Sequence, residues 1–296
     1  MRDCEVMEGS SEESCMRSGK KRKRIKITPG SEWTDNELDF FKIEVRHEES
    51  FSSFFSREFP IVEDFSEDVR DMLSVDLSNV GALRKMNWNT FTRKQTSRFV
   101  KHILAVTKTH INEESAVDDF ARTLLECFDY DEGDLVICSR EELKLDMCGS
   151  CTSAKPDLCV ETSKLTIKLL VQEDKSYQIS MNKTLANTNP EAQVIAEAIA
   201  AFQENNKIRR RLHLATEKKQ IIPCITMLGT CPTFYLFCVT HDLAEAVRLG
   251  EEPDEISIVR HYSIPMIGLP LGDAMLDNEI KLHAFQCYFS LRKYLF

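Results

Sequence analysis

The chain has 296 residues, of which 42% are hydrophobic, and it carries a formal net charge of −10 at pH 7. This length exceeds the usual size of one domain, so we expect one main domain and a smaller appendage. The sequence has no run of eighteen apolar residues and its first thirty residues are polar and charged, which argues against a transmembrane helix and a signal peptide and indicates a soluble, intracellular protein without a membrane partner.

Residues 1–30 form a polar segment that is rich in Ser, Glu, Lys and Arg. Such a segment cannot bury enough apolar surface to offset the entropy lost on ordering, so we predict that it is disordered. Within it, the basic run from Lys20 to Arg24 is typical of a nuclear-import signal, and similar runs also occur in ordinary solvated tails. The sequence leaves both interpretations open.

Residues 31–111 show an irregular pattern in which phenylalanines between Phe40 and Phe59 supply most of the apolar bulk. Short helices are predicted around 64–74 and 91–106. We interpret this segment as a mainly helical appendage that packs on the main domain or on a partner.

Residues 112–296 carry a clearer pattern. Apolar residues recur at helical spacing over 113–127 and 190–211, and Pro190 suits a helix start. The other predicted elements are strands over 134–138, 157–160, 165–172, 221–228 and 233–239, helices over 241–249 and 277–295, an extended segment over 255–264, and a polar loop between the first two strands. This order predicts an α/β or α+β domain with a mixed sheet flanked by helices.

Eleven cysteines are present, and several lie in apolar stretches, where a thiol behaves as a small hydrophobe. We therefore predict that they are reduced. Cys148 and Cys151 form the one CxxC motif. A zinc site needs a second pair of ligands at comparable spacing, which the sequence does not supply, so we interpret the motif as a loop with two free thiols.

Charged residues end the strand predicted over 165–172. Strict alternation from Leu165 places Glu173 and Lys175 on the same face as the apolar residues of this strand. A charge on a core face costs several kcal/mol unless it is paired or bound to a metal. Asp157, on the neighbouring strand, brings a second carboxylate to the same end of the sheet, and carboxylates are ligands that Mg²⁺ and Mn²⁺ prefer. The competing interpretation is a surface salt-bridge cluster at a strand end.

This pattern predicts a site for a divalent cation, Mg²⁺ or Mn²⁺. Asp157 and Glu173 are its expected ligands, and Lys175 is expected to position a water for attack on a phosphodiester. Glu114, on the preceding helix, is the expected further metal ligand, and the acids at 118–119 are alternatives to it. For Glu114 a solvated helix flank is an equally good interpretation.

The dipeptide Pro156-Asp157, followed sixteen residues later by Glu173-Asp174-Lys175, resembles the motif of the PD-(D/E)XK nuclease superfamily, which includes restriction endonucleases and RecB-type nucleases. The resemblance implies a restriction-endonuclease-like domain over 112–296 that cleaves DNA or RNA. Gln193 looks like the catalytic-site glutamine that RecB-type members place after this strand, and a solvated helix flank is the alternative. The aromatic residue that such members carry four positions later is Glu197 in this chain.

From about Trp33 to near the C-terminus, the chain also looks similar to a group of uncharacterised fungal proteins, which brings no established activity. The alternative to a nuclease is a catalytically inactive module that keeps the nuclease fold and serves as a scaffold for binding proteins or nucleic acid. The sequence leaves this choice, the protein partners and the oligomeric state open.

Basic residues gather at the end of the helix predicted over 190–211, and these are Lys207, Arg209, Arg210 and Arg211. Cations at this end complement the helix dipole, which explains them without a ligand. The chain as a whole is acidic, so binding of a nucleic acid would depend on a local basic patch. We predict that these four residues hold phosphates near the metal site.

Overall fold

The computed structural model describes residues 25–107, 114–173, 189–266 and 273–296. Its strands are β1 (Ile43–His47), β2 (Leu135–Ser139), β3 (Leu143–Met147), β4 (Ser150–Ala154), β5 (Leu158–Thr162), β6 (Ile167–Glu173), β7 (Lys219–Leu228), β8 (Cys231–Thr240) and β9 (Ser257–Ser263). In this part of the chain, seven strands form one sheet in the order β1-β9-β8-β7-β6-β5-β2, and β3 and β4 form a separate hairpin.

The α-helices are α1 (Asp35–Phe40), α2 (Phe51–Phe55), α3 (Glu67–Ser74), α4 (Val80–Leu83), α5 (Lys94–Val106), α6 (Glu114–Cys127), α8 (Pro190–Arg211), α9 (His241–Leu249) and α10 (Asn278–Leu291). Short 3-10 helices lie at Gly30–Glu32, Val62–Asp64, Trp88–Thr90, Ala274–Leu276 and Arg292–Tyr294. Within the described residues, no helix is both long enough and apolar enough to cross a membrane.

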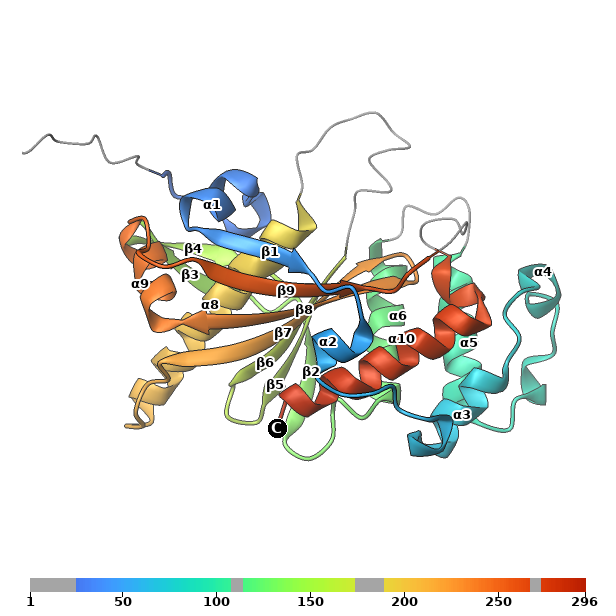
Figure 1. Cartoon of the computed structure of the whole chain (residues 1–296). Coiled ribbons are helices and arrows are strands. Elements are labelled where there is room, and N and C mark those ends of the chain that lie inside the picture. The colour runs from blue at the N-terminus through green and yellow to red at the C-terminus, as the bar shows by residue number, and fades with distance from the viewer. Residues whose placement is uncertain (1–24, 108–113, 174–188, 267–272) are drawn as a thin grey trace, which may run out of the picture.

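The sheet is mixed. β2 with β5, β5 with β6, β7 with β8 and β8 with β9 are antiparallel, whereas β6 with β7 and β1 with β9 are parallel. Parallel neighbours need a crossover connection, and α8 lies between β6 and β7 in the chain. Helices cover both faces (Figure 1), so the predicted mixed sheet flanked by helices is confirmed.

Two hydrophobic cores lie on opposite faces of the sheet. One core joins it to α2, α3, α5, α6 and α10, and the other joins it to α1, α8, α9 and the β3–β4 hairpin (Figure 1). Neighbouring residues of β6 enter different cores, since Leu169 belongs to the first and Leu170 to the second. Both faces of this strand are therefore buried, which removes the usual alternation of polar and apolar residues.

Helix α8 begins and ends where the sequence predicted. Pro190 occupies its first turn, and the side chain of Asn189 caps it by accepting from the Ala192 amide at 3.0 Å. Every residue from Val194 to Gln203 is buried, and many are alanines. Small side chains allow the helix to pack closely on the sheet, so α8 is a central element of its layer.

Strand β1 was not predicted. It pairs in parallel with β9, from Ile43 opposite Ser257 to His47 opposite His261. Only Ile43 is fully buried in it, because β1 lies at the edge of the sheet, and its hydrophobic signal is correspondingly weak. The segment over 31–111 is mainly helical, as expected, and it also extends the sheet of the residues that follow it.

The polar loop predicted around the CxxC motif is wrong, because the chain forms the β3–β4 hairpin there. Met147 pairs with Ser150, and the two residues between them, Cys148 and Gly149, both have positive φ values of 52° and 75°. Two such residues make a tight hairpin turn whose twist matches that of the strands. Both thiols of the motif are free, Cys148 half-buried in the turn and Cys151 exposed.

The strict alternation predicted from Leu165 is also wrong. Leu165 is exposed and lies in the β5–β6 turn with a φ of 63°, and the register between these strands shifts next to Val160. The irregularity sends Ile167 into the core beneath α8 and Leu169 into the opposite core. Face assignments for this strand therefore have to come from its pairing with its neighbours.

The N-terminal segment is described from Ile25 onward. Residues 25–30 are ordered, with Gly30 buried and Ile25 packed against the core beneath α8, which corrects the disorder predicted as far as residue 30. The basic run from Lys20 to Arg24 lies outside the described residues, so the import signal stays a prediction.

Candidate functional site

Asp157 lies at the end of the sheet, immediately before β5. Leu158 pairs with Val171, which places Asp157 across from Gln172 of β6. The Gln172 amide donates a hydrogen bond of 2.7 Å to the Asp157 carboxylate, and the Asp157 carbonyl accepts from the Arg140 amide at 2.9 Å. Asp157 is therefore held from its side chain and from its backbone.

The first half of α8 presents two polar side chains to this end of the sheet. Gln193 and Glu197 are one helical turn apart, and the Gln193 amide donates to the Glu197 carboxyl at 3.4 Å. Glu197 is fully buried. Burial raises its pKa well above the ordinary value, the nearby Asp157 raises that pKa further, and the hydrogen bond from Gln193 lowers it. The fold thus brings Asp157, Gln172, Gln193 and Glu197 together, and we call these four residues the Asp157 cluster.

Two of the predicted catalytic residues cannot be placed beside this cluster. Glu173 ends β6, with its backbone opposite Met227 of β7, and its side chain lies outside the described part. Lys175 lies wholly outside it. The backbone of Glu173 directly follows Gln172, which is a member of the cluster. The predicted convergence of Asp157, Glu173 and Lys175 stays a prediction.

The acids of α6 lie on the other side of the sheet from α8. The side chain of Glu114, the expected further metal ligand, lies outside the described part. Asp119 is exposed and near His102 of α5, where it partly offsets the lowering of the His102 pKa by burial. Asp119 therefore faces a neighbouring helix, and it is not part of the Asp157 cluster.

The donor atoms of the Asp157 cluster fit a hard divalent cation. It offers two carboxylates and two amide oxygens, the ligand type that Mg²⁺ and Mn²⁺ prefer. The Oε2 atom of Glu197 is buried and has no hydrogen-bond partner among the described residues. Across these residues, no group of three or more His, Cys, Asp or Glu side chains is arranged to hold a metal. Asp157 and Glu197 are the two acids of the cluster that the structure describes.

Comparison with known proteins adds no family. No family model matches the chain, and no curated protein matches it either. The resemblance to PD-(D/E)XK nucleases therefore rests on the motif residues of the sequence.

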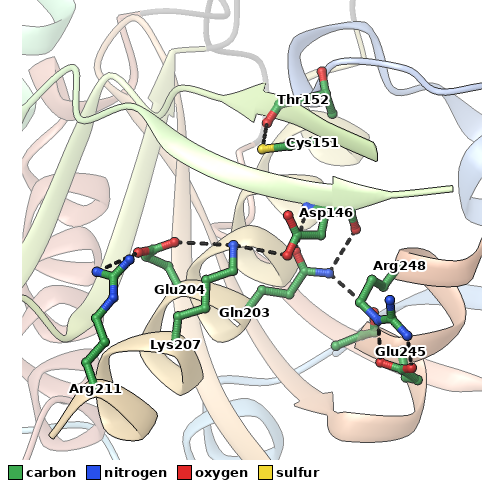
Figure 2. Close-up of polar contacts among 10 residues, drawn as sticks. Asp146, Cys151, Thr152, Gln203, Glu204, Lys207, Arg211, Glu245 and Arg248 are labelled. Atoms are coloured by element: carbon green, nitrogen blue, oxygen red, sulfur yellow. Dashed lines mark hydrogen bonds and ion pairs between the residues drawn. The ribbon is translucent and has the colours of Figure 1, made fainter. Parts of the chain in front are cut away.

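The opposite end of α8 carries the basic residues that were predicted to hold phosphates, and three of them pair with acids. Figure 2 shows the pairs of Lys207 and Arg211. Lys207 lies 3.0 Å from Asp146 of β3, and Arg211 lies 4.0 Å from Glu204. Arg209 lies 2.9 Å from Glu217. Arg210 is exposed. The charge of this end is therefore largely neutralised within the protein.

The basic end is also remote from the Asp157 cluster along the helix. A helix rises about 1.5 Å per residue, so the ten residues from Glu197 to Lys207 span roughly 15 Å. A nucleic acid that touched both would have to lie along α8, and its phosphates would have to displace the acids from Lys207, Arg209 and Arg211. Nucleic-acid binding at this end stays a prediction.

Sequence reasoning singled out Asp157 and Gln193 as candidates but passed over their neighbours in the Asp157 cluster. Glu197 was noted only where RecB-type members carry an aromatic residue, and Gln172 only as part of the strand. A usable signal was present, because Glu197 is the one acid in the run from Val194 to Phe202, which is otherwise apolar. A lone acid inside such a run marks a buried carboxyl.

Proposed function

We propose that the chain is a metal-dependent phosphodiesterase of the PD-(D/E)XK type that cleaves DNA or RNA. The observation that carries this proposal is the Asp157 cluster, in which an acid at the start of β5 meets a glutamine and a second acid from α8. The order of α6, the β5–β6 hairpin, α8 and β7 supports a restriction-endonuclease-like domain.

Each residue of the proposed site would have a separate role in cleavage. Asp157 and Glu173 would hold Mg²⁺ or Mn²⁺, and a bound divalent cation supplies the positive charge that a phosphodiester needs during cleavage. Gln172 keeps the Asp157 carboxylate oriented through its 2.7 Å hydrogen bond. Lys175 would orient the attacking water or hold a proton near it, and Gln193 would add a polar contact beside Asp157.

The test is a cleavage assay of the purified chain on single-stranded and double-stranded DNA and RNA, with Mg²⁺ or Mn²⁺. Asp157→Ala should lose both cleavage and cation binding, whereas Lys175→Ala should lose cleavage and keep cation binding. Equal activity in the wild type and in both variants would assign the cleavage to a contaminant or to another site. No cleavage of any substrate would reject the proposal.

A catalytically inactive binding module is the second candidate, and a specific observation favours it. Lys207, Arg209 and Arg211 are paired with acids, and the whole chain has a net charge of −10. Such a surface offers few free cations for phosphates. The two candidates differ in their response to metal, because a divalent cation that binds only the folded state stabilises it, and an inactive module has no need of that cation.

A further inference from the structure

Glu197 occupies a position where a carboxyl group needs an explanation. It is fully buried in the middle of α8, between apolar residues that fill the core beneath the helix. Burial raises the pKa of the Cys224 thiol of β7 and Glu197 raises that pKa further, so the side chain lies on the sheet side of the helix. An apolar side chain at this position would pack without loss of solvation, whereas a carboxyl loses its water.

The described residues satisfy only half of this carboxyl. Gln193 donates to its Oε1 atom at 3.4 Å, while its Oε2 atom is buried without a hydrogen-bond partner in the described ranges. No described Lys or Arg forms an ion pair with Glu197, although α8 carries several cations toward its other end. The Asp157 carboxylate disfavours ionisation of Glu197, because it raises the Glu197 pKa beyond the effect of burial.

Two carboxylates that share a buried space are stabilised when a cation lies between them. A divalent cation would remove the repulsion between Asp157 and Glu197 and would bind the Oε2 atom that has no other partner. The hydrogen bond from Gln193 reaches only the Oε1 atom of Glu197, so it does not supply a partner for Oε2. The arrangement therefore suits a cation ligand better than a packing residue.

We propose that Glu197 is a carboxylate ligand of the divalent cation at the Asp157 cluster, taking the place of the aromatic residue that RecB-type nucleases carry there. This inference rests on the proposed function, because it assumes that Asp157 binds Mg²⁺ or Mn²⁺. It adds a ligand from α8 to those expected from the β5–β6 hairpin.

The test measures binding of Mn²⁺ and Mg²⁺ to the full chain by calorimetry, together with the thermal unfolding midpoint with and without each cation. Glu197→Gln keeps the shape of the side chain and removes the charge, so it should fold normally and bind Mn²⁺ at least about tenfold more weakly. Glu191→Gln is the matched control on the same helix, because the Glu191 carboxyl is bonded to Tyr235 and should not contribute to the affinity. Asp157→Asn reports on the site as a whole.

The outcomes separate this inference from the proposed function. If Asp157→Asn loses Mn²⁺ binding while Glu197→Gln binds it like the wild type, Glu197 is not a ligand and the metal site itself stands. If the wild type binds neither cation, the inference and the metal dependence of the proposed function fail together. If Glu197→Gln does not fold, Glu197→Asp carries the test, because it keeps the carboxyl on a shorter side chain. Unchanged Mn²⁺ affinity in that variant would overturn the inference, and weaker affinity would support it.

Discussion

The two ends of α8 treat charge in opposite ways. At its C-terminal end, Lys207, Arg209 and Arg211 each have an acid within 4.0 Å, so their charges are balanced inside the protein. In its N-terminal half, Glu197 is buried next to another acid, and none of the described cations balances it. A charge that is already paired is explained by stability, whereas a buried carboxyl that no described cation balances points to a ligand.

The largest expected effect on stability concerns the C-terminal half of α8. Gln203 accepts from the Asp146 amide at 2.8 Å and donates to the carbonyls of Asp146 and Ala244 at 3.0 and 3.2 Å, which ties β3 and α9 to α8 (Figure 2). Gln203→Ala should lower the free energy of unfolding by about 2–3 kcal/mol, measured in urea, because it leaves these backbone groups without partners.

Gln193→Ala is the matched control in the other half of the helix. The hydrogen bond that its side chain donates to Glu197 is 3.4 Å long, so the loss should stay below about 1 kcal/mol. Equal losses in the two variants would contradict a division of α8 into a structural half and a site half.

A substitution at Glu197 should act in the opposite direction. Glu197→Leu removes a buried, half-satisfied carboxyl, so the free energy of unfolding without divalent cations should rise by about 1–3 kcal/mol in urea with a chelator present. Glu191→Leu is the comparison, and it should not stabilise because the Glu191 carboxyl has Tyr235 as a partner. Destabilisation by Glu197→Leu would mean that the carboxyl has a stabilising partner.

The raised pKa of Glu197 predicts how stability depends on pH. At pH values above the ordinary pKa of 4.5, Glu197 keeps its proton in the folded chain and has released it in the unfolded chain. The stabilising contribution of this proton is complete below that value and is lost as the pH rises through the folded-state pKa. Stability without metal should therefore fall less in Glu197→Gln than in the wild type as the pH rises above 4.5. Parallel curves for the two proteins would contradict the pKa shift.

The smallest effects are expected at the paired cations. Lys207 and its partner Asp146 are both partly buried, so Lys207→Ala should lower the free energy of unfolding by up to about 1 kcal/mol. Arg211 is exposed and lies 4.0 Å from Glu204, so Arg211→Ala should change it by less than about 0.5 kcal/mol. Urea unfolding in low salt measures both, and a larger loss for Arg211→Ala would reverse the expected order.

Local signals in the sequence were strong for the helices and weak for edge strands. Pro190 marked the start of α8, and the structure confirms that start. β1 was not predicted because its one buried residue, Ile43, gives no alternation. The polar strand β4 was not predicted for a similar reason, although Gly149 is typical of the turn before it. Long helices carry enough repeats to be recognised, whereas a short edge strand depends on partners that are distant in sequence.

The candidate site was predictable only in part. Asp157 and Gln193 followed from the motif, and the structure brings both to the same end of the sheet. Gln172 could not be found from alternation, because its role depends on its place across from Asp157 in the β5–β6 pairing. Glu197 could be recognised only from the packing of α8 on the sheet, because a buried acid is costly unless it has a partner.

The most direct test of the Asp157 cluster as a divalent cation site is the unfolding free energy of the full chain with and without Mn²⁺. Wild type should be stabilised by about 2.7 kcal/mol when free Mn²⁺ is one hundred times its dissociation constant, and Asp157→Asn at the same concentration should not be stabilised. No change in the wild type, or an equal change in the two proteins, would contradict a cation site at Asp157.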